Sequence, residues 1–171
     1  MGVPLFLLKL VLTAGVCGLI WWSLSEPDQG ILAEVTAFGP VVGALVALAF
    51  LAAVIAYCRD LVRLMHALRP ASRRASPTSF WLMLVIPWNF VEDFFIIASL
   101  AASLRSEAAD RPDLIGRWGR FGLVSGLAWC GLQIVSLVPH PVGSAAGLLA
   151  LPFWLWHWRF ARRARADLAP G

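Results

Sequence analysis

The sequence predicts an all-α protein that crosses a membrane several times, and two observations support this fold class. Of 171 residues, 60% are hydrophobic and only 14% are charged, and the mean hydropathy is +0.76, well above that of a soluble domain. Four apolar stretches also have the roughly 20 residues that a spanning helix needs, at about residues 4–24, 38–58, 118–138 and 141–160. We therefore expect a single transmembrane helical domain over residues 1–171.

A fifth apolar stretch, residues 79–104, is interrupted. Pro87 and Asn89 break its apolar pattern, and Glu92 and Asp93 follow near its middle. The apolar parts on either side of this break are each too short to span a bilayer alone. The stretch is therefore either a fifth, broken spanning helix or a re-entrant or interfacial helical hairpin that enters and leaves on one side.

The arginines discriminate between these two topologies, because cytoplasmic loops collect Lys and Arg. All basic side chains except Lys9 are arginines. Five spans would place the arginines of residues 59–74 on the opposite side from those of residues 105–120. If residues 79–104 instead return to the side from which they came, every arginine and both termini face the cytoplasm. We therefore favour four transmembrane helices plus a hairpin, with five transmembrane helices as the alternative.

The outer loops and the overall composition agree with this orientation. The first outer loop, residues 25–37, contains no Lys or Arg and carries Glu26, Asp28 and Glu34. Arginine in place of lysine, together with abundant alanine, is typical of a GC-rich bacterial genome. We expect a multipass protein of the bacterial inner membrane.

Ionisable residues at membrane depth are the most informative feature for function. Each costs about 2.5–3.5 kcal/mol on insertion scales, so such a residue usually has a partner or a purpose. Glu92 and Asp93, with Asn89 beside them and Gln133 on the third span, would form a polar intramembrane site. Built on a broken helix, this site could line the path of an ion, a proton or a polar ligand.

A structural role for the two carboxylates is the alternative. A helix that begins near Glu92 would be stabilised by acidic side chains at its positive N-terminal end. Arg59 or Arg63, at the end of the second span, could also neutralise a carboxylate in an ion pair. Lys9 lies in the first turns of its helix and is expected to extend its ammonium group to the inner surface.

Tryptophans also gather near the predicted membrane surfaces. Two of the nine tryptophans lie at the outer end of the first span, and four lie near inner ends, where an indole prefers the headgroup level. These residues are Trp21, Trp22, Trp118, Trp154, Trp156 and Trp158.

Two histidines raise the question of a haem group. His66 and His157 both lie near the inner surface, on the second and fourth spans. Two inward-facing imidazoles at one depth could ligate haem b, which makes a haem-binding redox subunit a further alternative. The three cysteines fall on separate predicted helices without metal-ligand spacing, so no metal site is expected.

The functional class that we expect follows from small residues on the predicted helices and from the absence of catalytic motifs. The small-xxx-small spacing that lets helices approach closely occurs twice, at Gly122 and Gly126 and at Gly143 and Gly147. The sequence contains no phosphate-binding loop, nucleophile elbow or zinc-protease motif, and its scattered charge of +4 does not suit nucleic acid. We expect a non-catalytic accessory or structural subunit that packs against a larger membrane complex. A small transporter or channel-like protein is the alternative.

Three short stretches carry a family resemblance. Residues 63–66 read Arg-Leu-Met-His, residues 76–80 read Ser-Pro-Thr-Ser-Phe, and residues 85–90 read Val-Ile-Pro-Trp-Asn-Phe. Here the chain resembles uncharacterised bacterial multipass membrane proteins that share a basic loop, a Thr/Ser-Pro turn and an apolar run ending in Ile-Pro-x-x-Asn or similar. The resemblance implies a membrane protein with a built-in break at Pro87 and Asn89, and it implies no catalytic residue.

Overall fold

The computed structural model describes residues 3–26, 37 and 39–169, and its regular structure there is entirely helical. This confirms the all-α fold class. Asp28 and Glu34 of the predicted acidic loop lie outside the described residues. The described elements are α1 (Val3–Ser25), α3 (Pro40–Ala67), η1 (Pro70–Ser72), η2 (Pro77–Leu84), α4 (Asn89–Ala108), α5 (Pro112–Trp118), α6 (Leu123–Val135) and α7 (Pro141–Asp167).

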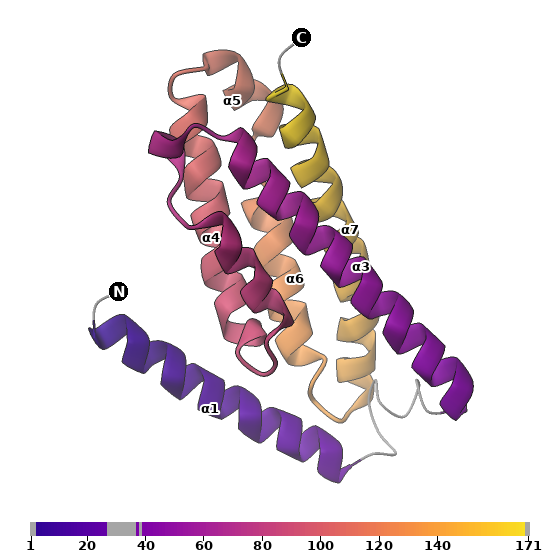
Figure 1. The fold of residues 1–171 in the computed structure, drawn as a ribbon. Coiled ribbons are helices and arrows are strands. Elements are labelled where there is room, and N and C mark those ends of the chain that lie inside the picture. Colours follow the sequence, from indigo (N-terminus) through magenta and orange to yellow (C-terminus); the bar gives the residue numbers. More distant parts are fainter. Residues whose placement is uncertain (1–2, 27–36, 38, 170–171) are drawn as a thin grey trace.

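Four of these helices, α3, α4, α6 and α7, form a bundle (Figure 1). Helices α6 and α7 are antiparallel neighbours with the most extensive contact in the bundle, and α3 packs against α7. Helices α3, α4 and α7 all terminate at the same end, whereas α6 runs in the opposite direction. Helix α1 lies outside the bundle and packs mainly on α4.

Helices α1 and α3 are long and apolar enough to cross a membrane. Their most apolar windows have mean hydropathies of 2.2 and 2.6, and only 11% of each window is buried within the protein. Large hydrophobic side chains point outwards on both helices, for example Val11, which is 69% exposed, and Leu45, which is 60% exposed. An apolar surface of this extent normally contacts lipid or another protein.

Residues 68–108 leave the end of α3 and return to the same end of the bundle (Figure 1). The 3-10 helix η2 runs down between α3 and α4 and packs on both. The Ser76 side chain caps it by accepting a backbone N–H of the first turn at 3.4 Å. The chain turns at Pro87, whose peptide bond is cis, and α4 begins at Asn89. The predicted interruption is thus a turn between two antiparallel helical segments.

The third apolar stretch forms a shorter helix than the sequence predicts. We expected one helix over residues 118–138, but α5 ends at Trp118 and α6 has only 13 residues, a length of about 20 Å. Phe121 and Gly122 have φ values of 56° and 72°, a left-handed backbone that interrupts a right-handed helix. The second and fourth stretches, in contrast, form helices that continue several residues past their predicted ends.

An aromatic cluster forms the centre of the bundle. Tyr57 is fully buried and meets the rings of Trp129, Trp154 and Trp158 edge-on, at centroid distances of 5.7, 5.6 and 5.8 Å. Trp154 and Trp118 are both buried inside the protein rather than on its surface. Their depth in a membrane stays a prediction. Trp154 packs in this cluster, and the indole of Trp118 donates a hydrogen bond within the protein, which removes both rings from the surface.

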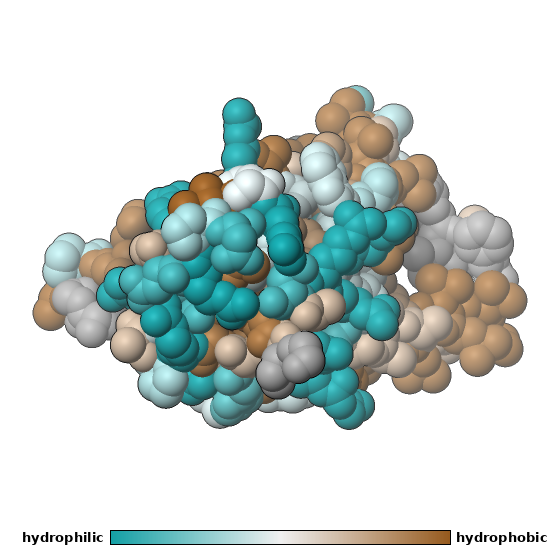
Figure 2. Space-filling model, turned by 90° about the horizontal axis from the view of Figure 1, so that it is seen from above, coloured by the Kyte–Doolittle hydropathy of each residue, from teal (hydrophilic) through white to brown (hydrophobic). Residues whose placement is uncertain are grey.

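All arginines lie at one end of the bundle. They occupy the last turns of α3, α4 and α7 and the connecting segments 69–74 and 111–120. Figure 2 looks onto this end and shows hydrophilic side chains gathered over it, with apolar side chains towards the rim. The fold therefore separates a basic end from a largely apolar remainder.

Candidate functional site

Glu92 forms a buried ion pair with Lys9, which joins α1 to α4. The Lys9 ammonium donates to Glu92 Oε2 at 2.6 Å, and the two side chains are only 6% and 12% exposed. The Lys9 Nζ atom also lies 4.3 Å from the centre of the Phe95 ring, one helical turn beyond Glu92. A cation held by a carboxylate and an aromatic face is well compensated for its loss of water.

This pairing differs from the partners that the sequence suggested for Glu92. Arg59 is exposed, and Arg63 lies 3.7 Å from Asp60 on its own helix. Both arginines occupy the basic end, whereas Glu92 lies in the first turn of α4, at the other end of that helix. Lys9 does not extend to the surface, because α1 packs along α4 and brings its ammonium group to Glu92.

Asp93 points away from Glu92, into the core. Successive residues of a helix differ by about 100° in direction, so only one of two adjacent side chains can face α1. Asp93 is 1% exposed and lies within electrostatic range of Tyr57, Cys58 and Cys130. Its Oδ1 atom is buried and has no hydrogen-bond partner among the described residues. It remains available to a proton, a water molecule or another polar group.

Tyr57 and His157 form the second polar contact of the core. The Tyr57 hydroxyl and His157 Nδ1 are 2.7 Å apart, which links α3 to α7 in the aromatic cluster. His157 is 1% exposed, and its Nε2 atom has no partner in the part of the chain that the structure describes. We call Asp93, Tyr57 and His157 the polar centre. All three are buried, and Tyr57 contacts His157 and lies within electrostatic range of Asp93.

Two of the predicted packing glycines allow the helices around this centre to approach. A Cβ atom on Gly126 would lie 2.5 Å from Ile97 Cγ2 and 3.0 Å from His157 Cδ2, and one on Gly122 would lie 2.5 Å from the Phe160 ring. Real Cβ contacts are longer than 3.0 Å, so only glycine fits without a shift. Gly126 therefore lets α6 touch both α4 and α7 beside the polar centre.

The second glycine pair has a different environment. A Cβ atom on Gly143 would collide with the carbonyl oxygen of Val138 in the preceding turn. Gly143 therefore permits the tight α6–α7 turn rather than a close approach of two helix faces. Gly147 lies one turn further along α7, on the wall of an apolar cavity.

Asn89 and Gln133 are not joined to either carboxylate by a hydrogen bond within the described chain. Asn89 is buried at the start of α4, and its Oδ1 atom lacks a partner there. Gln133 Oε1 is also buried without a partner among the described atoms. Gln133 lines a cavity of about 380 Å³ between α3, α6 and α7, together with Trp154. The predicted site therefore divides into an ion pair, a buried core centre and a separate cavity.

The structure does not bring the two candidate haem ligands together. His66 is exposed on the last turn of α3, whereas His157 is buried with Nδ1 bonded to Tyr57. They fail to meet because Tyr57 faces His157, and His66, nine positions further along α3, lies on the opposite side of that helix. We therefore do not propose haem ligation by this pair, and no group of three or more metal-ligating side chains occurs among the described residues.

Sequence reasoning missed Tyr57 and the acidic anchors of the basic end. Asp60 accepts a hydrogen bond from the Trp158 indole at 2.8 Å. Glu107 is 3% exposed at its side chain and accepts from both the backbone N–H and Nε of Arg69, at 3.1 and 2.9 Å. The hydrogen bond from Arg69 to Asp110 is the largest of the effects that raise the pKa of this guanidinium. An available signal was that Tyr57 is the only tyrosine and lies inside an apolar run.

Comparison of the chain with protein-family models, with curated proteins and with solved structures finds no match. The resemblance to uncharacterised bacterial membrane proteins therefore stays a prediction.

Proposed function

We propose that the chain is a multipass protein of the bacterial inner membrane, with spans at α1, α3, α6 and α7. Helices η2 and α4 would form a hairpin that enters from the cytoplasm and returns to it. The directions of the helices support this arrangement, because α3, α4 and α7 terminate at the same end. The arginines at that end support its cytoplasmic orientation.

Within this arrangement, α6 is the shortest span. Its 13 residues cover about 20 Å, less than the roughly 30 Å of a hydrocarbon core. The turns on either side of α6 would complete the crossing, shielded by α4 and α7, which pack on it. Irregular backbone at membrane depth is tolerated where protein covers it.

We further propose that the protein is a non-catalytic accessory subunit of a larger membrane complex. The observation that carries this proposal is the uncovered apolar surface of α1 and of the first half of α3. Helix α1 contacts the rest of the chain mainly through α4, and an apolar crevice of about 520 Å³ remains between them. A second membrane protein would bury surface that this chain leaves open.

Affinity purification from native membranes in a mild detergent tests this role, with co-migrating proteins quantified by mass spectrometry. We expect one partner at a constant ratio to the tagged chain. The double variant Leu7→Ala/Val11→Ala on α1 should reduce that ratio at unchanged membrane level. The matched variant Leu148→Ala/Leu149→Ala, on exposed positions of α7, should not. A chain that migrates alone, or only with itself, would refute the subunit proposal.

A transport role is the second candidate, because Asp93 is a buried carboxylic acid with an unpartnered oxygen among the described residues. Glu92 is neutralised by Lys9, so Asp93 would be the group that binds a proton or cation. In proteoliposomes, Asp93→Asn should abolish any flux that the wild-type protein supports. The same flux in wild-type, Asp93→Asn and empty vesicles would exclude this role.

A further inference from the structure

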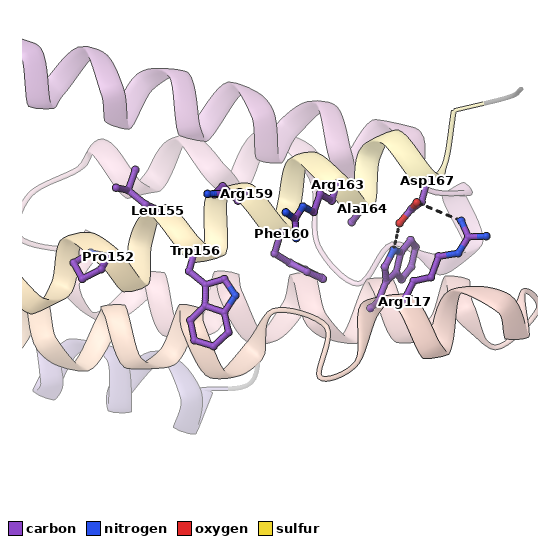
Figure 3. Close-up of a pocket in the computed structure, with 10 residues that line it drawn as sticks. Arg117, Pro152, Leu155, Trp156, Arg159, Phe160, Arg163, Ala164 and Asp167 are labelled. Atoms are coloured by element: carbon purple, nitrogen blue, oxygen red, sulfur yellow. Dashed lines mark hydrogen bonds and ion pairs between the residues drawn. The ribbon is translucent and has the colours of Figure 1, made fainter.

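A groove along the last turns of α7 combines cationic and apolar walls. It has a volume of about 800 Å³ and lies between α7 and the end of α5 (Figure 3). Pro152, Leu155 and Trp156 line one part, Phe160 follows, and Arg159 and Arg163 lie towards the C-terminal end of the helix. The lining therefore changes from apolar to cationic in one direction along the helix.

The arginines of the groove are available to an anion. Arg159 and Arg163 are one turn apart and exposed, and neither has an acidic partner among the described residues. Arg117, on the α5 wall, lies 3.4 Å from Asp167. The lining holds three arginines and one aspartate, so its net charge is positive. An adjoining hollow of about 320 Å³ shares Trp156 and Phe160 and adds Arg120.

The position of the groove fits the membrane boundary. Exposed leucines continue along α7 up to Leu155, and Trp156, which is 58% exposed, marks the change to arginine. An exposed indole at such a boundary prefers the headgroup level. From Pro152 to Asp167 the helix rises about 22 Å, close to half of the 40–45 Å thickness of a bilayer with its headgroups.

We propose that this groove binds one anionic phospholipid of the cytoplasmic leaflet. The phosphodiester would lie between Arg159 and Arg163, and an acyl chain would follow Trp156 and Leu155 towards Pro152. One observation carries the proposal. Along α7 the groove changes from apolar to cationic lining, just as a phospholipid changes from acyl chains to a charged headgroup. Basic pockets on the cytoplasmic side of membrane helices bind anionic headgroups in this way. The inference rests on the proposed membrane orientation.

Native mass spectrometry of the full chain in a neutral detergent tests the site. The purified protein is titrated with phosphatidylglycerol and with phosphatidylcholine of the same chain length. We expect one phosphatidylglycerol to bind at least tenfold more tightly than phosphatidylcholine, and more weakly as ionic strength rises. Arg159→Gln/Arg163→Gln should weaken binding of phosphatidylglycerol at least tenfold.

A control with the same loss of charge separates the groove from general attraction. Arg59→Gln/Arg111→Gln removes two arginines that do not line the groove, and it should change the dissociation constant less than threefold. Equal affinity for the two lipids, or equal losses in both double variants, would overturn the proposal. Displacement of the lipid by an equal concentration of inorganic phosphate would also overturn it, in favour of a free-anion site.

Failure of this inference can be distinguished from failure of the proposed membrane placement. Extraction of membranes with alkaline carbonate removes peripheral proteins and leaves integral proteins in the membrane. A chain that resists extraction but lacks headgroup selectivity would refute the groove alone. Release of the chain by carbonate would refute the membrane placement and the lipid site with it.

Discussion

Separating Lys9 from Glu92 should destabilise the protein more than breaking any surface ion pair. At 2.6 Å, two unit charges attract by about 6 kcal/mol with an effective dielectric constant of about 20. The cost of removing both groups from water offsets much of this attraction. Removal of one partner leaves the other buried and uncompensated, which typically costs about 3–5 kcal/mol. We expect Lys9→Met and Glu92→Gln each to cost about 3 kcal/mol.

A double-mutant cycle isolates the pair. The double variant Lys9→Met/Glu92→Gln leaves no uncompensated charge, so its loss should be only about 1 kcal/mol. Two single losses of about 3 kcal/mol then imply a coupling energy of about 5 kcal/mol. The free energy of unfolding is measured by titrating the protein with SDS in mixed micelles and following helical circular dichroism. Asp113→Asn is the matched control, because Asp113 and Arg117 are 4.0 Å apart and more than half exposed, and it should cost less than about 0.5 kcal/mol.

Additive losses in this cycle would refute the reasoning. Single variants that each cost under about 0.5 kcal/mol would do the same, because they would place the pair in water rather than in a buried contact. A local effect should accompany the global one, since α1 packs mainly on α4. The single variants should therefore expose α1 to proteolysis before the rest of the bundle unfolds.

Three further substitutions test the core and the basic end by the same unfolding assay. Gly126→Ala should cost about 1–3 kcal/mol, because the added Cβ would lie 2.5 Å from the Ile97 side chain. Gly131→Ala is the control. Its added Cβ would have no neighbour within 4 Å, so it should be neutral or stabilising. Tyr57→Phe should cost about 1–3 kcal/mol, because it leaves His157 Nδ1 buried without its partner. A loss of under about 0.3 kcal/mol would contradict this hydrogen bond. Glu107→Gln should cost about 2 kcal/mol. An unchanged midpoint would show that the contact of Glu107 with the half-exposed Arg69 does not hold the α3–α4 connection.

Composition and the apolar runs were sufficient for the fold class and for the approximate positions of the long helices. Long apolar runs form helices because helical hydrogen bonding satisfies every backbone group, and the break at Pro87 is a turn between η2 and α4. The length of the helix formed by the third apolar stretch could not be read in this way. Phe121 and Gly122 adopt a left-handed backbone in the α5–α6 connection. The hydrophobicity of these two residues does not predict that a helix is interrupted there.

The candidate site was only partly accessible from sequence. Glu92 and Asp93 stand out because acidic residues are rare in apolar runs, but their partners depend on which helices are neighbours. Lys9 is distant in sequence from Glu92, and only the packing of α1 on α4 brings them together. Tyr57 and His157 come from helices α3 and α7, and their contact depends on the crossing of those helices.

Cysteine labelling on either side of residues 79–104 tests whether they form a hairpin within a four-span protein. In a background without the three native cysteines, Arg111→Cys follows the hairpin, Ser76→Cys precedes it, and His140→Cys occupies the α6–α7 turn. An impermeant maleimide is applied to intact spheroplasts before and after the membrane is permeabilised. We predict that position 140 reacts at once, whereas positions 76 and 111 react only after permeabilisation. Labelling at position 111, but not at position 76, in intact spheroplasts would contradict the hairpin and establish five spans.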